Sequence, residues 1–225
     1  MGLLSAKSPS PVQQRKRIGE AVTRHLAAND AIKRVENDAA QIYFCHDYLD
    51  VGRCQTLIEV IDANRRPSTL LTSYYDNAFR TSESCDMDRW APDIRAVDEA
   101  LARLLGVEPE YGETMQGQRY APGQHFRAHH DYFHESEDYW QRVRHEGGQR
   151  TWTAMIYLND VEEGGATWFP QAGVRFRPKR GLLLIWNNMA LDGKANPATL
   201  HEGMPVEKGV KYIITKWFRE GRWIR

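Results

Sequence analysis

The sequence has 225 residues, of which 41% are hydrophobic and 11% aromatic, so it is long and apolar enough for one domain with a substantial core. Its 30 lysines and arginines are balanced by 30 aspartates and glutamates. This balance gives no overall field that would attract nucleic acid or an anionic membrane, and we expect neither as a partner.

Cysteine usage and the lengths of the apolar runs indicate the cellular compartment. Cys45, Cys54 and Cys85 are odd in number and have no metal-type spacing, and nothing else in the sequence points to an oxidising compartment. The first residues contain no apolar stretch of signal-peptide length, and the longest apolar run, Leu182 to Trp186, is too short to cross a bilayer. We therefore expect a reduced protein in the cytoplasm.

Three helices are predicted in the first half of the chain. Apolar residues at every fourth position from Ile18 to Leu26 predict a helix that flanks the domain, within an N-terminal extension covering residues 1–38. Asp50 can cap a second helix, which ends before Pro67. A third helix is predicted from Pro92 in its first turn to Gly106 just past its end.

From about residue 114 the pattern changes to short aromatic and β-branched runs separated by turn residues, which is typical of a β-sandwich or barrel. We expect the main domain to cover residues 39–225, with its β-core at about 114–220. The expected strands are an early one at Ile42–Phe44, then Thr114–Tyr120, Thr151–Leu158, Val174–Arg177, Leu182–Trp186 and Lys211–Phe218. The segments Leu71–Arg89 and His134–Arg150 are predicted to be polar loops, which often bind ligands when they are long.

A His-x-Asp pair, His129 and Asp131, follows a Pro-Gly turn. Residues two apart on an extended backbone point to the same side, so the imidazole and the carboxylate can converge on one ion. A second histidine would complete the two-His-one-carboxylate triad of non-haem iron oxygenases, and His201 is the best candidate because it follows a loop and precedes Gly203. Three further histidines crowd the first pair and remain alternatives: His125, His130 and His134.

Ordered blocks in the second half of the chain carry a more specific signal. They are Tyr120-Ala-Pro-Gly-Gln-His-Phe-Arg-Ala-His129-His-Asp131, Arg150 to Pro170 with Gly164-Gly165, and His201-Glu-Gly-Met-Pro-Val-Glu-Lys-Gly-Val-Lys211. These blocks closely resemble the prolyl 4-hydroxylase family of the 2-oxoglutarate/iron(II)-dependent dioxygenases. The resemblance implies a mainly β fold with flanking helices, a double-stranded β-helix or jelly roll.

The resemblance also implies roles for single residues. His129, Asp131 and His201 would bind Fe(II), and Lys211 would pair with the distal carboxylate of 2-oxoglutarate. Four further residues would surround this co-substrate: Tyr120, Tyr157, Thr167 and Trp217. Arg150, Arg80 and Tyr75 would contact the substrate, the last two from a loop that could close over an extended peptide.

The function that follows is hydroxylation of a C–H bond by O2 and 2-oxoglutarate, with peptidyl proline in a protein as the expected substrate and ascorbate as a further expected ligand. The alternative is a hydroxylase of a free amino acid or another small molecule on the same scaffold. A non-catalytic jelly-roll binding module would have no use for the four metal and co-substrate residues together, and a zinc hydrolase would not need Lys211. The oligomeric state is not indicated.

Overall fold

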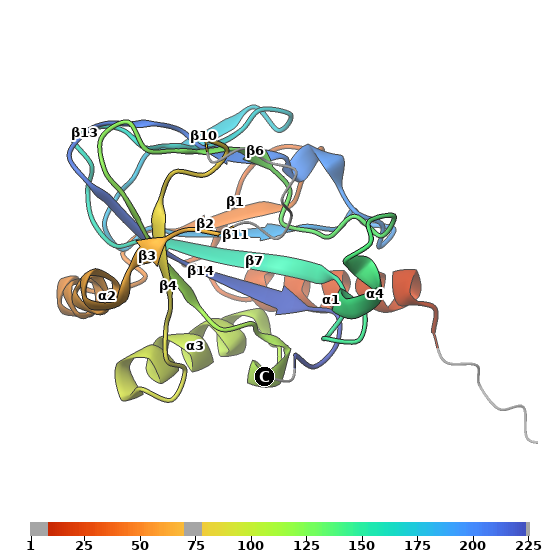
Figure 1. Ribbon diagram of the computed structural model, residues 1–225. Helices are drawn as coiled ribbons and strands as arrows, with labels where there is room; N and C mark the ends of the chain where they lie inside the picture. Colours follow the sequence, from red (N-terminus) through yellow and green to blue (C-terminus); the bar gives the residue numbers. More distant parts are fainter. Residues whose placement is uncertain (1–8, 70–77, 224–225) are drawn as a thin grey trace, which may run out of the picture.

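The computed structural model describes residues 9–69 and 78–223 and contains two antiparallel sheets that lie one above the other (Figure 1). The large sheet has the strand order β1 (Lys33–Arg34), β2 (Ile42–Cys45), β11 (Leu183–Asn187), β7 (Arg150–Tyr157), β14 (Lys211–Arg219), β5 (Gln116–Tyr120), β4 (Glu83–Asp86) and β3 (Arg66–Pro67). The small sheet has the order β10 (Val174–Phe176), β9 (Thr167–Phe169), β12 (His201–Gly203) and β6 (Phe126–His129). A short pair, β13 (Val206–Lys208) and β8 (Glu163–Gly164), accompanies them.

Neighbouring strands in both sheets are mostly far apart in the sequence, as the order β11-β7-β14-β5 illustrates. This long-range antiparallel pairing is the arrangement of a jelly roll, in which successive strands alternate between two sheets. The predicted fold class, a double-stranded β-helix with flanking helices, is confirmed.

Three helices, α1 (Pro11–Ala27), α2 (Val51–Asn64) and α3 (Pro92–Leu105), cover the face of the large sheet that points away from the small sheet (Figure 1). The described residues also form the short helix α4 (Trp140–Val143) and 3-10 turns at Pro109–Tyr111 and Pro197–Thr199. No helix in the described part of the chain is long and apolar enough to span a membrane.

Alternation along the central strands divides the apolar side chains between two cores. In β11, Leu183 and Ile185 pack with the helices, whereas Leu184 and Trp186 face the space between the sheets. Both sides of this strand are therefore buried, which explains why its sequence is a continuous apolar run.

The three predicted long helices are confirmed, together with the residues that bound them. Asp50 caps α2, because its carboxylate accepts the Arg53 backbone N–H at 2.9 Å. Gly106 ends α3 with a φ of 65°, in the left-handed region that a glycine adopts without steric cost. The expected strands are also present, with ends shifted by a few residues.

Both segments predicted to be polar loops contain regular structure, so these two predictions were wrong in part. Glu83–Asp86 forms β4 and pairs with β5, although its sequence shows no apolar-polar alternation. Trp140–Val143 forms the single turn of α4. The stretch Leu71–Asn77, including Tyr75, lies outside the described residues.

Candidate iron and co-substrate site

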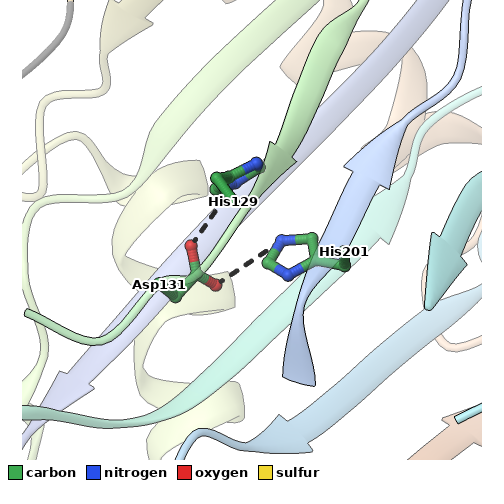
Figure 2. A group of neighbouring side chains, drawn as sticks. All are labelled: His129, Asp131 and His201. Atoms are coloured by element: carbon green, nitrogen blue, oxygen red, sulfur yellow. Dashed lines mark ion pairs between the residues drawn. The ribbon is translucent and has the colours of Figure 1, made fainter. Parts of the chain in front are cut away.

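Two strands of the small sheet bring the predicted metal ligands together. In the pairing of β6 with β12, His129 lies opposite His201, and Asp131 follows β6 by two residues. Figure 2 shows the Asp131 carboxylate facing both imidazole rings, with one oxygen toward each. One donor atom from each of the three residues lies within 4.8 Å of the other two.

Hydrogen bonds orient both imidazoles toward this common point. His129 Nδ1 lies 2.9 Å from the Arg127 carbonyl oxygen, and His201 Nδ1 lies 3.0 Å from the Thr199 carbonyl oxygen. A carbonyl only accepts, so each Nδ1 carries the proton and each Nε2 keeps its lone pair for a metal. The two Nε2 atoms lie 3.8 and 3.9 Å from the Asp131 carboxylate oxygens.

The protonation states also suit a cation. Burial, followed by the neighbouring His201 ring, lowers the pKa of His129 to about 3. Burial by itself would raise the pKa of Asp131, but His201, His129, Arg150 and the Thr153 hydrogen bond together hold this pKa below its ordinary value. At neutral pH the site therefore presents a neutral imidazole beside an ionised carboxylate, and this donor set fits iron(II).

A cavity of about 40 Å³ extends from the triad into the space between the sheets. Alternate residues of β14 line it, namely Lys211, Ile213, Thr215 and Trp217. At its inner end the Lys211 ammonium donates to the Gly165 carbonyl oxygen at 3.0 Å and lies 4.2 Å from the Tyr120 ring centroid.

Lys211 is 1% exposed, and it has no carboxylate partner among the described residues. Burial lowers its pKa to about 7. A buried amine without an anion is costly, whereas an incoming carboxylate would stabilise its charged form. This end of the cavity is therefore suited to an anionic group.

The other predicted co-substrate residues do not all line the cavity. Tyr120, Thr167 and Trp217 line it. Tyr157 is not among the lining residues, and its hydroxyl donates to Thr167 Oγ1 at 2.6 Å. Tyr157 therefore supports the cavity wall through Thr167.

His129 and Asp131 also border an open groove of about 1250 Å³, which both predicted substrate arginines line. Arg150 makes two hydrogen bonds to the Glu113 carboxylate, at 2.6 and 2.7 Å, and its guanidinium lies 4.1 Å from the Trp217 ring centroid. Arg80 lies over the Phe126 ring at 4.8 Å and donates to Gln116 Oε1 at 2.8 Å. Both guanidinium groups are thus held in place by other side chains at the groove wall.

The alternative histidines lie apart from the cluster. His125 Nε2 contacts the Ala78 carbonyl oxygen at 3.0 Å, and His130 Nε2 contacts the Pro197 carbonyl oxygen at 3.1 Å. His134 lines the open groove.

Sequence reasoning missed two residues that contact predicted site residues. Gln118 lines the cavity and accepts a hydrogen bond from the Tyr120 hydroxyl at 2.6 Å. Its position two residues before Tyr120 on the same strand was a usable signal. Thr153 donates to the Asp131 carboxylate at 2.7 Å, and no local spacing indicates this contact.

Comparison with known proteins agrees with this geometry. The family model described as the 2OG-Fe(II) oxygenase superfamily matches residues 115–219, which include the triad and Lys211. Prolyl 4-hydroxylase 1 of Arabidopsis thaliana is 32% identical over 204 residues, covering 80% of this chain and 69% of the relative.

Solved structures are also similar. The viral collagen prolyl hydroxylase of Paramecium Bursaria Chlorella virus-1, solved as a 2OG complex, has a TM-score of 0.63 and 26% identity, covering 79% of this chain and 95% of that one. A Pseudomonas putida prolyl-4-hydroxylase shares the fold with a TM-score of 0.58 and 19% identity, covering 90% of this chain and 98% of that one.

Fold and site together define a 2-oxoglutarate- and iron(II)-dependent dioxygenase. More narrowly, the chain belongs to the prolyl 4-hydroxylase family of these enzymes.

Proposed function

We propose that this chain hydroxylates proline residues in a polypeptide to 4-hydroxyproline, while 2-oxoglutarate is converted to succinate and CO2. The observation that carries the proposal is the joint placement, at the two ends of one cavity, of a two-His-one-Asp cluster and a buried lysine that pairs with no carboxylate of residues 9–69 and 78–223. Relatives named as prolyl 4-hydroxylases support proline as the acceptor.

Different side chains of the cavity would bind the metal and the co-substrate. His129, Asp131 and His201 would hold Fe(II), and Lys211 would bind the distal carboxylate of 2-oxoglutarate. Iron, O2 and 2-oxoglutarate, when bound, supply the oxidising power for the C–H bond. The walls between the sheets exclude bulk water, and Tyr120 and Thr167 orient the co-substrate from the sides.

The size of the groove favours a polymer over a free amino acid. It reaches His129 and Asp131, and its lining includes Trp90, Tyr132, Phe133 and Trp223, far more surface than one proline could contact. Aromatic walls suit an extended or polyproline conformation, whose ordering costs little entropy. We propose that Arg80, Arg150 and Tyr75 contact such a peptide.

Ascorbate and the cellular location belong to the proposal as well. Ascorbate would keep the iron in its ferrous state, and the cytoplasm is a reducing compartment that suits the three buried free cysteines, Cys45, Cys54 and Cys85.

The proposal is tested by incubating the chain with Fe(II), 2-oxoglutarate and ascorbate, with either proline-rich peptides or free proline, and measuring succinate. We expect peptides to stimulate succinate formation and to gain one oxygen atom on proline by mass spectrometry. Stimulation by free proline alone would instead favour the small-molecule alternative. No stimulation by either would contradict proline as the acceptor.

A further inference from the structure

The Asp131 carboxylate is held by a side chain that is neither one of the predicted metal ligands nor one of the predicted co-substrate or substrate residues. Thr153, on β7 of the large sheet, places its Oγ1 2.7 Å from Asp131 Oδ2. Asp131 is 5% exposed and Thr153 is completely buried, so water does not compete for this hydrogen bond. The contact joins a metal ligand of the small-sheet side to the large sheet.

A second buried residue completes the chain of contacts. Asn188 Nδ2 lies 2.9 Å from Thr153 Oγ1, and Asn188 is itself fully buried. Its backbone is held on both sides, since its N–H donates to the Thr151 carbonyl at 2.8 Å and its carbonyl accepts from Asn196 at 2.9 Å. The amide is therefore presented to Thr153 from a fixed backbone position.

The chemistry fixes the direction of these hydrogen bonds. An ionised Asp131 can only accept, so the single hydroxyl proton of Thr153 must be donated to it. The Thr153 oxygen then has only lone pairs left for its other neighbour, and Asn188 must offer its NH2 group. With the amide reversed, two oxygens without a shared proton would face each other in a buried space.

We propose that Thr153 and Asn188 are positioning residues for the metal centre. Asp131 lies beyond the end of β6, where strand pairing does not fix its side chain. The hydrogen bond from Thr153 prevents rotation of the carboxylate away from the two imidazoles, and Asn188 orients the Thr153 hydroxyl. This inference rests on the metal site of the proposed function but not on the identity of the substrate.

The test is Co(II) binding to the full apo chain, followed by d–d absorption during titration without 2-oxoglutarate or peptide. Thr153→Val keeps the side-chain shape and removes the hydroxyl. We expect it to weaken Co(II) binding roughly 10–100-fold, as is usual when a ligand's hydrogen-bonding partner is removed. Thr153→Ser, which restores a hydroxyl, should recover most of the affinity, and Asn188→Ala should give a smaller loss than Thr153→Val.

Thr151→Val is the matched control. Thr151 lies on the same strand, is 1% exposed and donates its hydroxyl to the Phe218 carbonyl at 3.2 Å, with no side-chain contact to the triad. We expect it to lower the melting temperature without changing Co(II) affinity or the absorption spectrum.

Equal Co(II) affinity in Thr153→Val and the unmodified chain would overturn the inference. So would an equal loss in Thr151→Val, or a failure of Thr153→Ser to restore binding. If Thr153→Val does not fold, the Co(II) affinity of Asn188→Ala decides, with Thr153→Ser as the folded variant that keeps the hydroxyl. Unchanged Co(II) binding in Asn188→Ala would contradict a positioning role for Asn188 and Thr153, and weaker binding would support it. Failure to hydroxylate a peptide would contradict the proposed function, but it would not change these Co(II) affinities.

Discussion

Lys211 is buried with no carboxylate partner in the described part of the chain, so the stability of its charged form depends on what binds beside it. Burial lowers its pKa to about 7, from an ordinary value near 10.5. Near neutral pH the free chain holds this amine only partly protonated, whereas an adjacent carboxylate would favour full protonation. Co-substrate binding should therefore be accompanied by proton uptake.

This proton uptake can be measured by calorimetry. At pH 8, where the Lys211 amine of the free chain is mostly neutral, we expect 2-oxoglutarate to bind to the Co(II)-loaded chain with uptake of close to one proton. The measurement repeats the titration in buffers of different ionisation enthalpy. Lys211→Met should bind 2-oxoglutarate at least about tenfold more weakly, because a desolvated charge pair is lost. Equal affinity in this variant would contradict the role of Lys211.

The lowered pKa also predicts how stability depends on pH. Between pH 7 and about 10.5 the unfolded chain binds more protons at Lys211 than the folded chain does, so its contribution to the free energy of unfolding increases with pH in this window. We compare the free energies of unfolding of the unmodified chain and Lys211→Met without co-substrate. As the pH rises from 7 to 9.5, we expect their difference to shift by up to a few kcal/mol in favour of the unmodified chain. Urea unfolding at pH 7 and pH 9.5 measures this, and a pH-independent difference would contradict it.

Two of the proposed metal ligands could be found from the sequence because their convergence has a local cause. His129 and Asp131 share one side of an extended segment by their spacing alone. The role of Thr153 could not be found in this way, because its contact with Asp131 depends on how β7 lies against the end of β6. Tyr157 illustrates the same limit: its strand was predicted, but the hydrogen bond that turns it toward Thr167 depends on packing between the sheets.

At the scale of the element, β14 places one buried lysine on each of its two faces. Lys211 faces the cavity, and Lys216, an odd number of positions along the strand, faces the helices. Lys216 forms a buried ion pair with Asp98 of α3, with side-chain exposures of 1% and 5%. One lysine therefore serves the site, and the other attaches a helix to the sheet.

Loss of the Lys216–Asp98 ion pair should lower the stability of the fold but leave Co(II) binding unchanged. Asp98→Ala leaves the Lys216 charge without its partner, and we expect it to lower the free energy of unfolding by roughly 3–5 kcal/mol. Urea unfolding measures the loss, and the folded variant should bind Co(II) normally. The double variant Asp98→Leu with Lys216→Met should recover much of the stability. A loss below about 1 kcal/mol in Asp98→Ala would contradict a coupling of this size.

The elements that could be predicted are those with local signals. The capping residue Asp50 and the terminal Gly106 mark helix ends directly, and the apolar run Leu182–Trp186 marks a strand buried on both sides. β4 was missed because Glu83–Asp86 is largely polar and lies near the edge of the sheet, where backbone pairing with β5 holds it. Such pairing is non-local and leaves little trace in the segment itself.

At the scale of the whole molecule, bound Fe(II) and 2-oxoglutarate would connect the two sheets. The proposed metal ligands come from the small-sheet side, whereas Lys211 comes from the large sheet. A ligand that spans the cavity should therefore stabilise the complete fold, because the unfolded chain offers no such site.

Thermal unfolding with Co(II) and 2-oxoglutarate tests this linkage. At concentrations 100-fold above the dissociation constant, a ligand should add about 2.7 kcal/mol to the free energy of unfolding. We expect Lys211→Met to retain the Co(II) contribution and lose most of the 2-oxoglutarate contribution, and His201→Ala to lose both. An undiminished 2-oxoglutarate effect in His201→Ala would place its binding site elsewhere.

The assignment of the site and its reaction is tested most directly by incubation under ¹⁸O2 with a proline-rich peptide, Fe(II) and 2-oxoglutarate, followed by mass spectrometry. We predict one heavy oxygen in 4-hydroxyproline and the other in succinate, with both products absent in His201→Ala. Hydroxyproline whose oxygen comes from water, or turnover that survives the loss of His201, would contradict the assignment of the site.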